Sequence, residues 1–497
     1  MIQALSAAAG DGTTVQVIRA AADAFLESPH AIRLLGSRAR DVESPYSTPE
    51  LLAIETRILD EAVQLQRSGR GAVAPESTDS AIARRPFLAD EQRTMVRRLT
   101  RDGDGVSVVI GLAGTGKTTA LAAAREAWAQ SDIPVRGCAL ARKAARELEQ
   151  KAGLRSTSVA SLLHRPRALP AGTVLVVDEA GMLGTRDLEK LLGLVEDARG
   201  KLVLAGDASQ LPSIQAGGAL QALSARLDPI VLQEIRRQRH AWERDAVEAL
   251  RVGDQAALER YADKGRLVVG RDDQEVLPKL IADWHGYDDP DGAVMIAHRR
   301  ADVAELNARA RAVMRATGQL GAEELVAGAA FAAGDRVLVK RNDSRCDVRN
   351  GDRGVIDRVD QGEGSLYVRF DERTVVLDAR FLSQPTQSGR PALEHGYAIT
   401  AYAAQGMTCR HALVLARDDA YREWIYTTMT RASEANRLYV VGERQRGRDR
   451  EEFAPAEPAS DGRVLLAAAL TRSNADELAL ERLLPPRELD RSDGRTL

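Results

Sequence analysis

A glycine-rich stretch at residues 106–119 contains the residue types that hold a polyphosphate. It is VSVVIGLAGTGKTT, and it fits the pattern G-x-x-x-x-G-K-[ST]. Glycines let backbone N–H groups close around phosphate oxygens, and the N-terminus of a following helix adds partial positive charge. The lysine can reach the terminal phosphates and the threonine hydroxyl can hold Mg²⁺. We therefore predict a nucleotide site formed by Gly111, Gly114, Thr115, Gly116, Lys117, Thr118 and Thr119.

Two adjacent acids follow a second apolar run. Residues 174–177 are Val-Leu-Val-Val, and Asp178 and Glu179 come next. In an open sheet of parallel strands, ligands bind beyond the carboxyl ends of the strands, so these acids should face the glycine-rich stretch. Asp178 is placed to hold Mg²⁺ through water, and Glu179 to orient and deprotonate an attacking water molecule. The pair therefore predicts hydrolysis of the bound nucleotide.

Two glutamines complete the set of side chains that we expect at the nucleotide site. Gln210 lies on a tight turn after an apolar run at 201–205, where its amide can contact a γ-phosphate and respond to its loss. Gln92 lies upstream of the glycine-rich stretch. Because a glutamine amide pairs with both the donor and the acceptor on the edge of adenine, we expect Gln92 to contact the base of ATP.

These residues require a scaffold of alternating strands and helices. Apolar segments typical of strands occur at 106–110, 135–139, 174–178, 201–205 and 230–232, with helices after the first three. A second α/β series comprises 292–297 and 307–317, then 398–401, 411–416, a helix around 421–431, and 438–441. Such alternation indicates an α/β fold of parallel sheets with both faces covered.

A segment of different character interrupts the second series. Its residues alternate between apolar and polar types, with turn signals between the runs, at 334–339, 350–356, 365–370 and 373–377. We predict a small antiparallel barrel inserted at about residues 330–385. Outside the two series, residues 1–85 are expected to form a helical N-terminal region and linker, and residues 446–497 a charged, partly helical tail.

The composition excludes several classes of protein. With Lys+Arg 69 against Asp+Glu 72, the net charge is -3, so any contact with nucleic acid must rely on a local groove. The three cysteines are far apart and form neither a metal cluster nor a disulfide framework. No apolar run approaches the roughly eighteen residues of a membrane span. We therefore expect a cytoplasmic protein without membrane association.

Taken together, six segments resemble the motifs of superfamily-one helicases, and specifically those of the RecD-like branch. In chain order they are GLAGTGKTT, VLVVDEAGML, GDASQLPSI, EIRRQ, YAITAYAAQGMT and YTTMTRA, similar to motifs I to VI. The resemblance covers about residues 86–445. It implies two RecA-like P-loop domains, at 86–232 and 233–445, with ATP between them, and an SH3-like fold for the inserted barrel.

The resemblance also implies roles for residues in the second half. Arg237 and Arg431 are implied to reach the γ-phosphate, and Gly406 to line the nucleotide site. An arginine placed against the charge of a transferring phosphoryl group contributes about 10³–10⁵ in rate. Since both arginine-bearing segments belong to the same chain as the glycine-rich loop, one molecule can complete the site, and we expect a monomer.

Further segments narrow the resemblance to the helicase half of MobF-type conjugative relaxases. ARKAAREL and TSVASLLH are similar to the DNA-contacting segments Ia and Ib, and imply that Arg142, Ser161 and His164 contact single-stranded DNA. Thr400 and Tyr402, in the fifth motif, imply further DNA contacts. A histidine triad and an N-terminal tyrosine pair that would nick DNA are missing, so the sequence resembles the motor without the relaxase.

The fifth motif departs from the pattern of this branch, which carries His-Lys-Ser before Gln-Gly. Here Tyr402-Ala403-Ala404 precede Gln405-Gly406. The change removes a lysine that contacts phosphate, and stacking of Tyr402 on a base would be worth about 1–3 kcal/mol instead. Two functions follow. One is an ATP-dependent translocase that moves 5′ to 3′ on single-stranded DNA, with conjugation or DNA-processing proteins as partners. The other is a nucleotide-dependent DNA-binding accessory protein, or relaxase remnant, that does not translocate.

Overall fold

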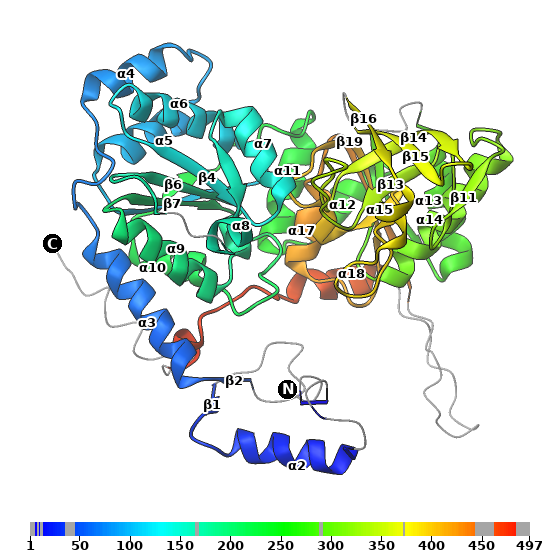
Figure 1. Cartoon of the computed structure of the whole chain (residues 1–497), viewed down its shortest axis with the longest axis horizontal. Coiled ribbons are helices and arrows are strands. Elements are labelled where there is room, and N and C mark those ends of the chain that lie inside the picture. Colours follow the sequence, from blue (N-terminus) through cyan, green and yellow to red (C-terminus); the bar gives the residue numbers. More distant parts are fainter. Residues whose placement is uncertain are drawn as a thin grey trace.

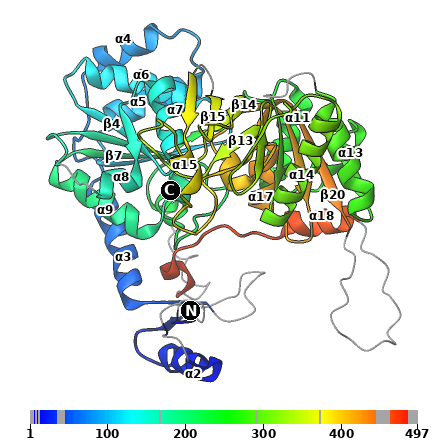
Figure 2. The same ribbon diagram turned by 45° about the vertical axis from the view of Figure 1, so that its right-hand side comes forward.

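The computed structural model describes residues 5–6, 9, 13–34, 45–164, 168–287, 292–370, 373–442 and 462–483. Two parallel sheets lie side by side, and an antiparallel unit covers part of the second one (Figures 1 and 2). An extended N-terminal region projects from the first sheet on the long helix α3 (Pro49–Gln64). Among the described helices, none is both long and apolar enough to cross a membrane.

The first sheet has six parallel strands in the order β5-β4-β6-β7-β3-β8. They are β3 (Val106–Gly111), β4 (Val135–Ala139), β5 (Ser156–Ser158), β6 (Val174–Asp178), β7 (Lys201–Gly206) and β8 (Ile230–Leu232). Successive side chains of β6 point to opposite faces: Val174 and Val176 pack beneath one layer of helices, and Leu175 and Val177 beneath the other. Five of the six strands were predicted, and the short edge strand β5 was not.

Helices cover both faces of this sheet. The helices α5 (Asp90–Arg101), α6 (Lys117–Ala129) and α7 (Arg142–Ala152) share one core with the sheet. On the other face lie α3, α9 (Thr185–Asp197) and α10 (Ala219–Arg226). Between β5 and β6 the chain forms the short helix α8 (Val159–His164).

The second sheet is also fully parallel, in the order β18-β10-β19-β20-β9. Its strands are β9 (Leu267–Gly270), β10 (Ala293–Ala297), β18 (Ala398–Thr400), β19 (Cys409–Ala416) and β20 (Ala432–Val441). Its helices are α11 (Ala241–Val252), α12 (Ala256–Asp263), α13 (Asp273–His285), α14 (Arg300–Ala316), α16 (Ala401–Ala404) and α17 (Arg422–Met429). The segment 307–317 of the second series therefore lies in helix α14, and the edge strand β9 was not predicted.

An antiparallel unit is inserted between α14 and β18. Its sheet has the order β16-β15-β14-β13-β17, formed by β13 (Arg336–Val339), β14 (Arg353–Asp360), β15 (Ser365–Phe370), β16 (Arg373–Leu377) and β17 (Leu393–His395). A hairpin of β11 (Glu324–Val326) and β12 (Ala330–Ala332) precedes it, and α15 (Ala379–Ser383) lies between β16 and β17. The prediction of four antiparallel strands is confirmed, whereas the hairpin and β17 were not predicted.

An asparagine in the middle of α14 holds the strand that follows the insertion. Asn307, on α14, donates from Nδ2 to the carbonyl oxygen of Ala398 at 3.1 Å, and its Oδ1 accepts from the Ala398 amide at 2.9 Å. Asn307 is buried, so both hydrogen bonds are shielded from water. The strand β18 is thereby fixed to α14 at the place where the chain leaves the insertion.

The chain ends contribute short elements. The N-terminal region contains α2 (Val15–Leu26), the antiparallel pair β1 (Ile32–Arg33) and β2 (Tyr46–Ser47), and α4 (Pro75–Ala83). The side chain of Thr48 caps α3, as the Thr-Pro-Glu sequence at 48–50 predicts. The C-terminal region contains α18 (Gly462–Thr471) and the 3₁₀ turn η2 (Ala479–Arg482). The remaining predicted tail, at 446–461 and 484–497, lies outside the described residues.

A buried lysine at the start of β7 costs the first domain stability. Lys201 is 0% exposed, and its ammonium has no hydrogen-bond partner among the described residues. Burial lowers the pKa of Lys201 from 10.5 to about 8, although Asp104 and Asp102 oppose the change. Below pH 8 the lysine is charged in both the folded and the unfolded protein, so the full cost of burying the charge is present. That cost is relieved as the pH rises toward 10.5, because only the unfolded chain then still binds the proton.

We therefore expect Lys201→Met to stabilise the protein. A shift of this size corresponds to about 3 kcal/mol in the free energy of unfolding at neutral pH. Urea unfolding should show the gain at pH 7 and a shrinking gain as the pH approaches 10.5. Lys190→Met, at an exposed position on α9, is the matched control and should leave stability unchanged. A Lys201→Met protein no more stable than this control would show that the lysine is not charged when buried.

Candidate nucleotide site

The glycine-rich loop joins β3 to α6 at the carboxyl edge of the first sheet. Gly114 and Gly116 have φ angles of 86° and 79°, in the left-handed region that glycine tolerates best. A Cβ atom on Gly114 would lie 2.5 Å from Cβ of Arg237, so only glycine fits there. The Gly114 carbonyl also accepts from the backbone amide of Arg236 at 3.0 Å. The loop is therefore shaped by its own conformation and by the segment that carries Arg237.

Lys117 is held inside the loop. Its ammonium donates to the carbonyl oxygen of Gly111, and Nζ lies 3.4 Å from the carbonyl oxygen of Leu112. Thr115 donates from its hydroxyl to the same Leu112 carbonyl at 3.0 Å. A phosphate group offers stronger acceptors than these carbonyls, because it is charged. The ammonium can therefore exchange its loop carbonyls for phosphate oxygens without leaving the loop.

Gln92 braces the loop from the first turn of α5. Its Nε2 donates to the carbonyl oxygen of Thr115 at 2.9 Å, and its Oε1 accepts from the backbone amide of Ala89 at 3.0 Å. Gln92 is 5% exposed. Since both ends of the amide are bonded, an adenine base would have to displace these partners, and the contact between Gln92 and the base stays a prediction.

Asp178 and Glu179 lie at the end of β6, opposite the loop. Burial raises the pKa of Asp178 to about 6, and the adjacent Glu179 carboxylate acts in the same direction, while Lys117 opposes them. The backbone amide of Glu179 donates to Oδ1 of Asp178 at 3.0 Å. Glu179 has a φ of 56°, an uncommon conformation for a residue with a side chain. Two acids confined in this way are suited to bind a divalent cation and to activate water.

Two arginines approach the loop from the second half of the chain. Arg431 is 1% exposed; its Nε donates to the carbonyl oxygen of Thr427 at 2.7 Å, and its Nη2 to Oγ1 of Thr430 at 2.8 Å. Nη1 of Arg237 donates to the Thr430 carbonyl oxygen at 3.0 Å. Burial, together with the neighbouring Arg431 guanidinium, lowers the pKa of Arg237 to about 10. Both arginines remain cationic at neutral pH, and bound anions would relieve their mutual repulsion.

These groups line one cavity of about 380 Å³ between the two halves. Among the residues predicted for the site, the cavity is lined by Gly114, Thr115, Gly116, Lys117, Thr118, Thr119, Asp178, Glu179, Gln210, Arg237, Gly406 and Arg431. Gly111 and Gln92 support the loop from behind. Residues separated by more than three hundred positions in the sequence are thus brought together, and we call this space the nucleotide cavity.

Two side chains that sequence analysis did not select connect the walls of the nucleotide cavity. The hydroxyl of Tyr426, on α17, donates to Oδ2 of Asp207 at 2.8 Å and accepts from the amide of Ala113 in the glycine-rich loop at 3.4 Å. Gln210 Nε2 lies 3.3 Å from the same Asp207 oxygen. Tyr426 and Asp207 belong to the YTTMTRA and GDASQLPSI segments. Because both residues lie within motif-like segments, the sequence contained a signal for each of them. It contained no signal for their contact, which joins one domain to the other.

The residues predicted to contact DNA on the first half lie near one another. Nη2 of Arg142, at the start of α7, donates to Oγ of Ser161 on α8 at 3.3 Å. Ser161 also forms a 2.8 Å hydrogen bond with Ser158. His164 ends α8 and is exposed. These three residues therefore mark one exposed edge of the first domain.

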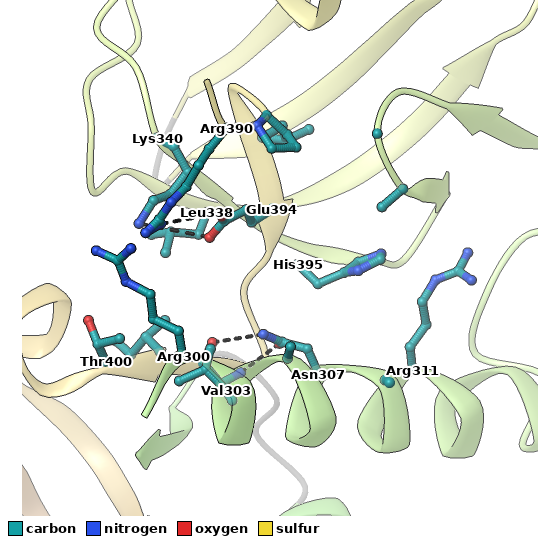
Figure 3. A pocket seen from close by; sticks show the side chains of 18 of the residues that line it. Arg300, Val303, Asn307, Arg311, Leu338, Lys340, Arg390, Glu394, His395 and Thr400 are labelled. Atoms are coloured by element: carbon teal, nitrogen blue, oxygen red, sulfur yellow. Dashed lines mark hydrogen bonds and ion pairs between the residues drawn. The ribbon is translucent and has the colours of Figure 1, made fainter. Parts of the chain in front are cut away.

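On the second half, Thr400 borders a cavity of about 870 Å³ between α14 and the antiparallel unit (Figure 3). Three cationic side chains, Arg300, Lys340 and Arg390, point toward one another at this end of the cavity, and we call it the basic groove. Glu394 lies 3.8 Å from both Lys340 and Arg390. Three cations around a single carboxylate leave an excess of positive charge, which suits a phosphate backbone.

Tyr402 lies between the two halves. Its ring is half-buried against the core of the second domain, and its hydroxyl donates to the carbonyl oxygen of Pro212, just beyond Gln210, at 3.3 Å. The same residue lines a further cavity, together with Arg300 and the 212–217 loop. The tyrosine that replaces the usual motif therefore contacts the turn that carries Gln210, and its stacking on a base stays a prediction.

The fold and the nucleotide cavity define a class of protein. A glycine-rich loop after a parallel strand, acids on the neighbouring strand and two arginines from a second parallel-sheet domain are the parts of a P-loop nucleoside triphosphatase that closes around its nucleotide. In such an arrangement one domain binds the phosphates and the other responds to them.

Comparison with known proteins agrees with this class. Residues 87–272 match the AAA domain family. The chain is 34% identical to a probable conjugal transfer protein TraA of Sinorhizobium fredii, over 84% of this chain but only 38% of that protein. It is 28% identical to the RecBCD enzyme subunit RecD of Mycolicibacterium smegmatis, over 78% of this chain and 76% of that one. It is 27% identical to the ATP-dependent RecD2 DNA helicase of Deinococcus radiodurans, over 72% and 49%.

The fold itself is shared with a solved helicase structure. Pif1 helicase from Candida albicans superposes with a TM-score of 0.50 at 17% identity, over 71% of this chain and 94% of that one. The chain is therefore related to the RecD-like helicases and to the conjugal transfer proteins. It spans less than two fifths of the TraA protein that it matches.

Proposed function

We propose that this chain hydrolyses ATP and uses the energy to move along single-stranded DNA. The observation that carries the proposal is the nucleotide cavity, where Lys117, Glu179 and Arg431 converge from both domains. Lys117 and the loop amides bind the phosphates, and Glu179 orients and deprotonates the attacking water. The arginines Arg237 and Arg431 stabilise the charge that develops on the phosphoryl group.

The residues also fit a divalent cation. Thr118 and Asp178, which line the same cavity, would hold Mg²⁺, the hydroxyl directly and the carboxylate through water. The confined, partly buried pair Asp178 and Glu179 supplies the negative charge that such an ion requires. When bound, Mg²⁺ would neutralise negative charge on the phosphates, in addition to the positive charge that the protein side chains supply.

The proposed path of the DNA runs over the exposed edges of both domains. Arg142, Ser161 and His164 contact it on the first domain, and Thr400 and Tyr402 on the second. The basic groove, with Arg300 and its neighbours, extends this path beneath the antiparallel unit, which we propose to be an SH3-like barrel that grips the strand. Closure and opening of the nucleotide cavity would alternate the affinities of the two grips, and movement would be 5′ to 3′.

Steady-state ATP hydrolysis with and without single-stranded DNA tests this function. We expect DNA to raise the rate at least about tenfold, and a rise in salt from 50 to 200 mM to remove most of the increase, because counterions compete for the phosphates. Duplexes with a single 5′ or 3′ tail then report movement and its direction, and only the 5′-tailed duplex should be unwound. Hydrolysis that ignores DNA, or hydrolysis without strand displacement, would contradict the proposal.

A further inference from the structure

The C-terminal segment 472–481, which we call the strap, joins the two halves of the molecule. It leaves α18, which packs beneath the second sheet against β20 and α17, and it ends in η2 beside α3 of the first half. Figures 1 and 2 both show this red segment crossing from one half to the other along a single edge.

One anchor of the strap lies on the helix that leads to Arg431. Glu423, in the first turn of α17, is 1% exposed. Its Oε1 accepts from the Ser473 hydroxyl at 2.7 Å, and its Oε2 from the Asn474 amide at 2.8 Å. A buried carboxylate that accepts several hydrogen bonds from one segment fixes the position of that segment. The strap is therefore bound to the element that positions the arginine.

The other anchor lies on the turn that carries Gln210. Oδ2 of Asp476 accepts from the amide of Ser213, three residues beyond Gln210, at 2.7 Å. The strap passes this loop at backbone distance: a Cβ atom on Gly217 would lie 2.6 Å from Asp476 Oδ2, and one on Gly218 would lie 2.7 Å from the carbonyl carbon of Glu477. The two glycines make room for the strap.

The two anchors are separated by one residue. Ala475 alone lies between Asn474, bound to the second half, and Asp476, bound to the first. Two residue steps of extended chain span about 7 Å, so the anchors cannot move farther apart unless one of these hydrogen bonds breaks. Close by, the Leu211 amide donates to Oγ1 of Thr427 at 3.0 Å, which is a second contact between the same two elements.

We propose that the strap holds the Gln210 turn in register with the Arg431 helix, and that Asp476 and Glu423 are positioning residues for ATP hydrolysis. The inference rests on the proposed function, because it assigns Gln210 and Arg431 to the γ-phosphate. The strap keeps this edge of the nucleotide cavity closed, and the domains move by rotation about it. A movement of Gln210 that follows hydrolysis of the nucleotide is then transmitted to the 212–217 loop and to Tyr402, because this edge of the cavity does not open.

Alanine at position 476 tests the anchor on the first half. Asp476→Ala removes the acceptor for Ser213, and we expect the DNA-stimulated kcat to fall about tenfold while KM for ATP stays within about twofold. Asp476→Asn keeps an acceptor oxygen and should recover most of the rate. Glu481→Ala, on the same strap, removes only an ion pair with Arg226 at 3.4 Å and should match the wild type. The melting temperature is measured for every variant.

Glu423→Gln tests the other anchor, because its amide nitrogen cannot accept a hydrogen bond, and it should reproduce the loss of kcat. An unchanged kcat in Asp476→Ala, an equal loss in Asp476→Asn, or a loss that follows the melting temperature would overturn the proposal. A wild-type protein without DNA-stimulated hydrolysis would instead refute the function on which the proposal rests. The two failures are therefore distinguishable.

Discussion

The Lys117→Ala protein is expected to lose ATP hydrolysis while it still binds single-stranded DNA. Lys117 is the only lysine ammonium within the glycine-rich loop, where it now rests on the carbonyl oxygens of Gly111 and Leu112. Loss of a preorganised cation at a transferring phosphoryl group costs at least about a hundredfold in kcat. Phosphate release measures the rate, and fluorescence anisotropy of labelled single-stranded DNA measures binding.

The control for this variant is Lys190→Ala, on the exposed face of α9 in the same domain. It should keep both hydrolysis and DNA binding. Substantial turnover by Lys117→Ala would mean that the glycine-rich loop is not the catalytic nucleotide site. Simultaneous loss of DNA binding would place the lysine at the DNA instead.

Replacement of Arg431 should also lower the rate of ATP hydrolysis by a large factor. Arg431 lies on the opposite wall of the nucleotide cavity, with its guanidinium held by Thr427 and Thr430. An arginine that stabilises phosphoryl-transfer charge contributes about 10³–10⁵ in rate, or roughly 4–7 kcal/mol. We expect the kcat of the Arg431→Ala protein to fall by that factor, with a much smaller change in its affinity for ATP.

Arg431→Lys tests whether the positive charge alone is sufficient for catalysis, since lysine keeps the charge but not the planar fork of donors. Because Thr427 and Thr430 both bind the fork, the lysine variant should recover only a small part of the rate. Thermal unfolding must accompany the assay, since Arg431 is buried. A well-folded Arg431→Ala protein with kcat within tenfold of the wild type would contradict the role in catalysis.

The first parallel-sheet domain was predictable because its signals are local. The strand β3, the glycine loop and the start of α6 are contiguous, and the buried strand β6 leads directly into Asp178. A fully buried parallel strand is a continuous apolar run, which is visible without knowledge of its partners. The second domain was harder to predict, because β9 has four residues and pairs with residues 438–441, far along the chain.

The links between the domains could not be predicted from the sequence. The contact of Tyr426 with Asp207 depends on how two domains face each other, and neither residue stands out from its neighbours in the sequence. Gln92 shows the opposite problem. Its amide can pair with adenine, but in the structure its nitrogen binds the glycine-rich loop and its oxygen accepts from the Ala89 amide. The residue type alone cannot distinguish these partners.

The paired hydrogen bonds of Asn307 have a consequence for how this protein could be engineered. Because they join α14, which precedes the antiparallel unit, to β18, which follows it, these two flanking elements are held together independently of the unit. A connection between elements that are already held together tolerates large changes in length, since closing a longer loop adds little entropy cost. The unit could therefore be exchanged for that of a relative with the second sheet intact. Such chimaeras would show whether DNA binding and ATP hydrolysis depend on separate parts of the protein.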